Sequence, residues 1–249
     1  MECPRCKIEN PQENKFCNEC GYDLRISVVQ SMLAKAWEME LKGLYLEAGA
    51  EFEKILESTP RGDIHLHVGN LYYRLAKLKE AIFHLERALD LCPNKADVHY
   101  SLGLVYYKEA RIDKAVEEFK ETLELNPNFH AALYMLGIVY YHQGKLDEAC
   151  EVYKKLIEAH PKYIIAYYYL GVACAAKGLT NETIEAFKKV LETSPDDAMA
   201  YYHLGIAYEK KGDLDASIAA FRRAVELDPE DIRSKENLKT LEGMREKFS

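Results

Sequence analysis

Four cysteines near the amino terminus have the residue type and spacing that point most directly to chemistry. Cys3 and Cys6 form one C-x-x-C pair, and Cys17 and Cys20 form a second pair after ten intervening residues. Two residues between thiolates allow a tight turn to aim both sulfurs at one ion, and a second pair completes a tetrahedron. Four thiolates leave no open coordination position, so the pattern predicts one structural Zn²⁺ rather than a catalytic metal. Iron suits the same S4 geometry and stays open as an alternative.

The segment around these cysteines is too short to bury enough surface to fold alone, so bound metal is expected to supply its stability. Its second half, the run FCNECG at 16–21, resembles the short zinc ribbons found at the amino terminus of many prokaryotic signalling and regulatory proteins. We therefore expect a zinc ribbon over residues 1–26.

A fixed spacing organises the rest of the chain. Prolines recur every 34 residues, and glycines recur at the same interval ahead of them: Pro93, Pro127, Pro161, Pro195 and Pro229, with Gly69, Gly103, Gly137, Gly171 and Gly205. Apolar residues between them follow the i, i+3, i+4, i+7 spacing of helices. Such a period indicates stacked helical units rather than one globular core. Glycine on the first helix lets a second helix cross closely, and proline ends that second helix.

The positions of these residues resemble the tetratricopeptide repeat (TPR) family over roughly 200 residues. The resemblance implies an all-α fold, a right-handed α–α superhelix of helical hairpins. It also implies six repeats over 29–231, namely 29–61, 62–95, 96–129, 130–163, 164–197 and 198–231. Residues 232–249 then read as an amphipathic helix that caps the last repeat.

In this family the first helix of each repeat lines a concave groove that binds partner segments. The fifth, ninth and twelfth positions of these helices assign the groove to Leu66, Asn70, Tyr73, Tyr100, Leu104, Tyr107, Tyr134, Ile138, Tyr141, Tyr168, Val172, Tyr202 and Ile206. Asparagine, frequent at the ninth position in relatives, occurs there only at Asn70. Tyrosine offers a large rigid contact area and one hydrogen-bonding group, so the pattern predicts an apolar or aromatic protein or peptide partner.

Bulk properties narrow the class further. The formal charge of −8 argues against nucleic acid or an anionic membrane surface as the main partner. No apolar run is long enough to span a bilayer, and no secretion signal begins the chain, so we expect a cytoplasmic protein. Cysteines clustered at one end fit metal binding in a reducing compartment better than a disulfide framework.

No enzyme motif accompanies these features. The sequence holds no H-E-x-x-H pair and no phosphate-binding glycine loop, so we expect a non-enzymatic interaction scaffold. Two alternatives stay open: a nucleic-acid-associated regulator that uses the ribbon, and a repeat array that associates with itself.

Overall fold

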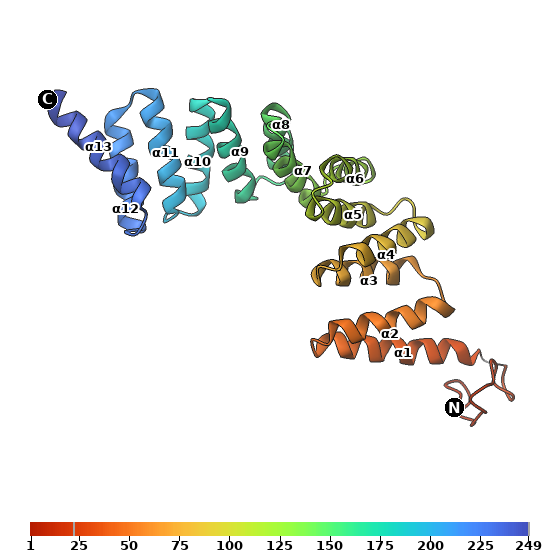
Figure 1. The fold of residues 1–249 in the computed structure, drawn as a ribbon. Helices are drawn as coiled ribbons and strands as arrows, with labels where there is room; N and C mark the ends of the chain where they lie inside the picture. The colour runs from red at the N-terminus through yellow and green to blue at the C-terminus, as the bar shows by residue number, and fades with distance from the viewer. Residues whose placement is uncertain (22, 249) are drawn as a thin grey trace. The chain divides into compact units, whose positions relative to one another are not determined.

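The computed structural model describes residues 1–21 and 23–248, and within that range it leaves out the side chains of residues 27, 247 and 248. Tyr22 and Ser249, which belong to the predicted ranges 1–26 and 232–249, lie outside the described residues. Figure 1 shows a run of helices that follows a short irregular amino-terminal segment. In the described residues, β-structure is limited to two isolated bridges within that segment. The all-α fold class predicted from the sequence is confirmed.

The chain divides into two compact units, residues 1–118 and 119–249, called unit 1 and unit 2 below. The helices of unit 1 are α1 (Leu24–Leu41), α2 (Tyr45–Ser58), α3 (Gly62–Arg74), α4 (Leu78–Leu91) and α5 (Ala96–Lys108). Helix α6 (Ile112–Leu125) contains the division. Unit 2 continues with α7 (His130–His142), α8 (Leu146–Ala159), α9 (Ile164–Lys177), α10 (Thr180–Thr193), α11 (Ala198–Lys211), α12 (Leu214–Leu227) and α13 (Ile232–Phe248). Among the described helices, none is long and apolar enough to cross a bilayer.

Close helix crossings explain the periodic glycines. A Cβ atom added to Gly171 would lie 2.8 Å from the ring of Phe187, and one added to Gly205 would lie 2.7 Å from the ring of Phe221. Both phenylalanines are fully buried. Each of these glycines therefore makes room for the large side chain of its own hairpin, and any other residue would push the two helices apart.

Left-handed residues link the two helices of each hairpin. Gly144, Gly178 and Gly212 have φ angles of 73°, 82° and 81°, as glycine allows at no steric cost. In unit 1 the first such turn uses Gly43, but the next two use Ala76 and Ala110, with φ angles of 57° and 58°. Alanine in this conformation brings its Cβ too close to the backbone, so these two turns carry a local strain that the glycine turns avoid.

Replacing Ala76 by glycine should therefore stabilise unit 1 by about 0.5–1 kcal/mol, because the relieved strain exceeds the extra chain entropy that glycine loses on folding. Urea denaturation followed by circular dichroism measures the change. The matched variant Gly178→Ala should be destabilising by a similar amount, since a Cβ there meets no atom within 4 Å and only the backbone is affected. A stability loss in Ala76→Gly would contradict this interpretation of the turn.

A hydrogen-bonded chain within unit 1 runs from two buried histidines to the partly exposed carboxylate of Glu53. The Nδ1 atoms of His65 and His84 lie 3.1 Å apart, and Nε2 of His84 lies 3.3 Å from Oε1 of Glu53. The Tyr72 hydroxyl donates to the same carboxylate oxygen over 2.8 Å. Because Glu53 only accepts, His84 must donate through Nε2 and accept through Nδ1 from the Nδ1–H of His65. Both imidazoles are neutral in this arrangement, which joins α2, α3 and α4.

Acid should weaken unit 1 through these two histidines. Burial lowers the pKa of His65, with His84 and Arg87 adding to the effect, and burial lowers the pKa of His84 against the opposing carboxylate of Glu53. At a pH below the unfolded pKa, these two histidines therefore bind protons in the unfolded chain but not in the folded chain. Stability is therefore lost as the pH falls below the unfolded value of about 6.5, by up to about 1.4 kcal/mol per pH unit for each histidine.

Urea unfolding of unit 1 between pH 7 and pH 5, followed by hydrogen exchange, measures this loss. The control is the double variant His65→Leu, His84→Val, which introduces the residues found at the same two positions of the repeat 130–163 (Leu133 and Val152). Its stability should change less over that range, because the two buried imidazoles with lowered pKa values are gone. An equal pH dependence in the two proteins would assign the effect to other groups.

Candidate metal centre and partner-binding face

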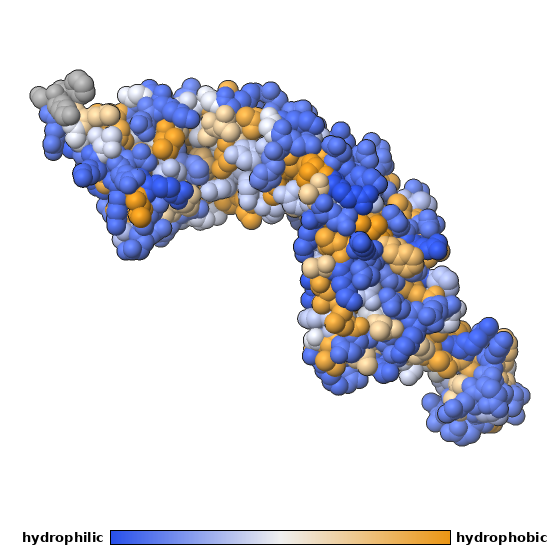
Figure 2. Space-filling model, in the orientation of Figure 1, coloured by the Kyte–Doolittle hydropathy of each residue, from blue (hydrophilic) through white to orange (hydrophobic). Residues whose placement is uncertain are grey.

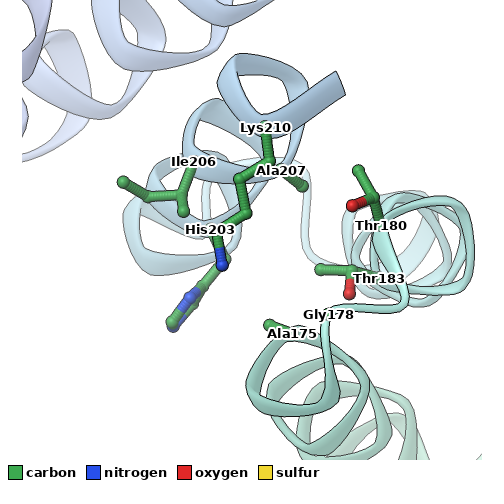
Figure 3. A pocket seen from close by; sticks show the side chains of 8 residues that line it. All are labelled: Ala175, Gly178, Thr180, Thr183, His203, Ile206, Ala207 and Lys210. Atoms are coloured by element: carbon green, nitrogen blue, oxygen red, sulfur yellow. The ribbon is translucent and has the colours of Figure 1, made fainter. Parts of the chain in front are cut away.

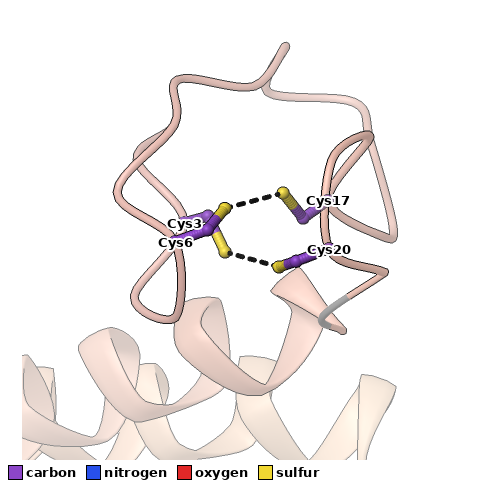
Figure 4. A group of neighbouring side chains, drawn as sticks. All are labelled: Cys3, Cys6, Cys17 and Cys20. Carbon is purple, nitrogen blue, oxygen red and sulfur yellow. Dashed lines mark hydrogen bonds between the residues drawn. The ribbon is translucent and has the colours of Figure 1, made fainter.

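The four amino-terminal cysteines lie together in the structure (Figure 4). Their sulfur atoms are all within 4.8 Å of one another. The Sγ atoms of Cys3 and Cys20 are 3.6 Å apart, and those of Cys6 and Cys17 are 3.5 Å apart. These separations are too long for disulfides and close to the edge of about 3.8 Å expected for a ZnS4 tetrahedron with bonds of about 2.3 Å. The cluster could hold one metal ion.

Both cysteine pairs have the same backbone geometry. The N–H of Lys7 donates to the carbonyl of Cys3, and the N–H of Gly21 donates to the carbonyl of Cys17, over 2.8 and 3.0 Å. Lys7 and Gly21 both take left-handed φ angles, of 65° and 68°. Each pair is thus a tight turn that ends in a left-handed residue and aims both of its sulfurs toward the other pair.

Backbone N–H groups inside these turns favour negative sulfur. The N–H of Cys20 lowers the pKa of the Cys17 thiol to about 6. For Cys3, burial acts in the opposite direction, but the N–H groups of Cys6 and Arg5 prevail and its pKa is lowered. These donors stabilise thiolates, the form of cysteine that binds metal.

The Cys6 thiol differs from those of Cys3 and Cys17. The N–H of Ile8 lowers the pKa of Cys6, yet burial and the neighbouring thiols of Cys17 and Cys20 together raise it to about 12. Four thiolates cannot coexist at this spacing without a compensating positive charge. The donor set, its spacing and its N–H groups therefore fit a divalent ion of the zinc or iron type.

The first helix joins this cluster more closely than the sequence indicated. Leu24 is fully buried against Cys3 and Cys17, and α1 begins at that residue, with the side chain of Asp23 accepting from the N–H of Arg25. The last three residues of the predicted range 1–26 are thus helical. Leu24 is part of the small apolar core around the cysteine cluster and also the first residue of α1.

The predicted groove residues occupy a consistent environment. All thirteen are half-buried, so each belongs neither to the core nor to the freely exposed surface. In unit 2 they lie on α7, α9 and α11, and we call them the open face of unit 2: Tyr134, Ile138, Tyr141, Tyr168, Val172, Tyr202 and Ile206. In unit 1 they lie on α3 and α5: Leu66, Asn70, Tyr73, Tyr100, Leu104 and Tyr107. The structure contains no partner, so their role in binding stays a prediction.

Two residues that the groove prediction left out lie among the tyrosines of unit 2. Tyr169 contacts Tyr134 edge to face, with ring centres 5.3 Å apart. His203 stacks on Phe187 at 4.7 Å, and its Nε2 lies 3.4 Å from the Tyr168 hydroxyl. Both occupy the sixth position of their repeats, so an aromatic residue or histidine there is the sequence signal that could have found them.

Helices α7 and α9 of unit 2 carry fewer charged side chains than α3 and α5 of unit 1. Helix α7 contains no Asp, Glu, Lys or Arg, and α9 contains only Lys177 at its last position. By contrast, α3 begins with Asp63 and α5 with Asp97 near their amino ends. A helix with apolar residues on every side is normally covered on every side. The space-filling view in Figure 2 shows apolar patches within a mostly hydrophilic surface.

A small pocket opens between α9, α10 and α11 (Figure 3). Ala175 lines it at the twelfth repeat position, where earlier repeats carry Tyr73, Tyr107 and Tyr141. The missing tyrosine ring leaves the space, and Lys210 and Thr180 add polar groups to its wall. The pocket adjoins Ile206 of the open face.

Stacked hairpins that present side chains on one face define a class of interaction proteins, and the comparisons agree. The sequence pattern of the tetratricopeptide repeat family matches residues 100–164 and 180–232, and a second TPR repeat pattern matches residues 69–109. No curated protein matches the sequence. The chain belongs to the tetratricopeptide repeat family, and this fold supports a role as a protein-interaction scaffold.

Solved structures of this class resemble the chain over most of their own length. YrrB, described as a TPR protein with an unusual peptide-binding site, matches with a TM-score of 0.69 and 23% identity over 76% of this chain and 97% of its own. MamA matches with a TM-score of 0.62 and 30% identity over 66% of this chain and 96% of its own. A tetratricopeptide repeat protein from Parabacteroides merdae matches with a TM-score of 0.65 and 17% identity over 86% and 98%.

Proposed function

We propose that this chain is a non-enzymatic adaptor that binds an apolar or aromatic protein segment on the open face of unit 2. The observation that carries the proposal is the near absence of charge on α7 and α9, whose outward residues are tyrosines and aliphatic side chains. Apolar area left half-exposed on a folded protein favours association, and tyrosines are frequent among residues that dominate binding energies.

Recognition on this face would be non-covalent. The tyrosine rings supply rigid contact area, and their hydroxyls supply hydrogen bonds at the edge of the contact. Separately, the predicted groove residues of unit 1 include Asn70, whose amide suits a peptide backbone. Binding of a peptide is the stated property of YrrB, which shares the fold.

The proposal includes a structural zinc ribbon whose ligands are Cys3, Cys6, Cys17 and Cys20. Zinc supplies the cross-link that this short segment needs, and with four thiolates bound it offers no open position for chemistry. The proposed division of the chain is a ribbon over 1–26, six repeats over 29–231 and a capping helix over 232–249. Its proposed location is the cytoplasm, where thiols stay reduced.

Replacing Tyr134 by alanine should weaken binding of a partner segment about 30-fold, equivalent to about 2 kcal/mol. The probe is a peptide selected from a random displayed library against the full chain, and affinity is measured by titration calorimetry. Tyr167→Ala is the matched control, because Tyr167 is also a half-buried tyrosine of unit 2 but packs toward the core at the fourth repeat position. Equal affinity in Tyr134→Ala and the unmodified chain would reject the open face as the binding site.

Two further experiments on the full chain test the alternative functions, self-association and nucleic-acid binding. Light scattering of the full chain and of a chain lacking residues 232–249 reports self-association. A gel-shift series at increasing salt reports nucleic-acid binding, since phosphate contacts weaken steeply with ionic strength.

A further inference from the structure

Two buried cysteines of unit 2 lie against each other. Cys150 on α8 and Cys174 on α9 have their Sγ atoms 3.9 Å apart, although 24 residues separate them in the chain. Their exposed fractions are 6% and 1%. Only three cysteines lie outside the amino-terminal cluster, and two of these three are in contact.

The two positions normally hold other residues. Cys174 occupies the eleventh repeat position, and Cys150 occupies the twenty-first. Four other repeats carry tyrosine at the eleventh position and four carry a branched aliphatic residue at the twenty-first: Tyr72, Tyr106, Tyr140 and Tyr208, with Ile82, Val116, Ile184 and Ile218. Both substitutions to cysteine thus fall at one junction between consecutive hairpins.

Unit 1 shows that these two positions are neighbours in this fold. Gly49 lies against the Tyr72 ring, where an added Cβ would be 3.1 Å from the hydroxyl oxygen. The equivalent contact in unit 2 brings two sulfur atoms together instead. The thiols are therefore close together because the packing of consecutive hairpins brings these two positions into contact and because both residues are cysteines.

The surroundings of Cys150 and Cys174 should make their thiols react slowly. Burial and the neighbouring Cys150 raise the pKa of Cys174 to about 12. An ion pair between Lys177 and Asp147 lies close by at the surface, and its hydrogen bond raises the pKa of Lys177. A reagent reaches the thiols only when the junction of α8 and α9 opens locally, so reaction takes longer than at an exposed thiol.

We propose that Cys150 and Cys174 are a redox modification site that forms a reversible disulfide across the junction of consecutive repeats. The oxidant is a small-molecule disulfide such as glutathione disulfide. One cysteine thiolate attacks it and releases one glutathione thiolate, which leaves a mixed disulfide on the protein. The second cysteine loses its proton, attacks the protein sulfur and releases the second glutathione. Two protein thiols are thereby oxidised by two electrons, and one glutathione disulfide becomes two glutathiones.

The disulfide would tie α8 to α9, the helix that carries Tyr168 and Val172 of the open face. This inference does not depend on the proposed function, because it concerns only the two sulfurs and the helices that hold them. Its failure would leave the interaction scaffold untouched, and a failed peptide-binding test would leave the thiol pair untouched.

The test uses the full, zinc-loaded chain equilibrated in glutathione buffers of increasing oxidised fraction, then alkylated and digested with trypsin. Lysines between the two cysteines place them in separate peptides, 146–154 and 163–177. We expect these peptides to be recovered as one linked species, lighter by about 2 Da than the sum of the two thiol peptides. Dithiothreitol should separate them.

Two variants control the result. Cys150→Val introduces the residue that the preceding repeat carries at this position, and it should abolish the linked species. Cys92→Ser removes the cysteine of unit 1 that lies outside the amino-terminal cluster, and it should leave the linked species unchanged. Oxidation of the unmodified chain should also raise the thermal midpoint of unit 2 by about 5 °C or more, with no rise in Cys150→Val. Linkage of either cysteine to any other thiol, or two free thiols at every glutathione ratio, would overturn the proposal.

Discussion

Replacing Cys17 by serine should abolish stoichiometric zinc binding and unfold the amino-terminal segment while the helical array stays folded. Metal analysis after dialysis against a chelator should find about one zinc per unmodified chain and almost none in the variant. A hydroxyl is a poor substitute for a thiolate, so affinity should fall by well over the roughly 100-fold that loss of an outer partner costs.

The physical reason for unfolding is the size of the segment. The apolar core of the amino-terminal segment consists of the cysteines and Leu24, with Met1 packed beside them. The metal supplies on the order of 10–16 kcal/mol in comparable peptides, far more than this core provides. We expect residues 1–21 to lose hydrogen-exchange protection and the first turn of α1 to fray, because Leu24 then loses its cover.

Cys92→Ser is the matched control, since Cys92 is a cysteine of the same unit that lies outside the cluster. It should keep its zinc and its protected amides. A Cys17→Ser chain that retains one tightly bound zinc would show that these four sulfurs are not the ligands. If visible absorption showed iron in the purified protein, the identity of the bound metal would be iron, but its ligands would still be these four cysteines.

Replacing Phe187 by alanine should cost about 3–5 kcal/mol of stability in unit 2. The side chain is fully buried, and its ring stacks on His203 and contacts Tyr168 at 5.5 Å between ring centres. Its removal leaves a cavity at the crossing that Gly171 makes possible, and the stiff helices on either side can close it only in part. Burial lowers the pKa of His203. The cavity should admit water beside that imidazole and bring its titration closer to the ordinary range.

Hydrogen exchange measured helix by helix is the appropriate readout, because repeats communicate mainly with their neighbours. Protection should fall most in α9, α10 and α11. Phe83→Ala is the control, since Phe83 is 54% exposed and its loss should change stability by no more than about 0.5 kcal/mol. Comparable losses in the two variants would mean that Phe187 is not a central packing residue.

Much of the architecture could be predicted from particular residue types at fixed spacings in the sequence. The glycines at 34-residue intervals predicted close helix crossings, and the 2.6–2.8 Å approaches of Leu85, Tyr153, Phe187 and Phe221 to Cβ atoms added at these glycines bear this out. The two C-x-x-C pairs predicted a cysteine cluster, and the four sulfurs do converge. These features depend on short spacings or on a repeated period, which sequence displays directly.

Other features depend on which residues of different helices meet. Ala76 and Ala110 take the left-handed turn position without the glycine that would have marked it. Cys150 and Cys174 look like two unrelated small hydrophobic residues until the helices are placed. The histidine pair of unit 1 likewise appears only when α3 and α4 pack, because each imidazole alone fits an ordinary packing position.

By itself, then, the sequence determined the repeat, its all-helical fold and the convergence of four amino-terminal thiols, because local sterics and periodic burial act through residues at fixed separations. Tertiary structure alone decided the partners of the buried histidines, the contact of Cys150 with Cys174 and the start of α1 inside the core of the ribbon. Those outcomes depend on how far side chains reach across a helix junction, and that reach is set by packing between segments rather than by the order of residues within one.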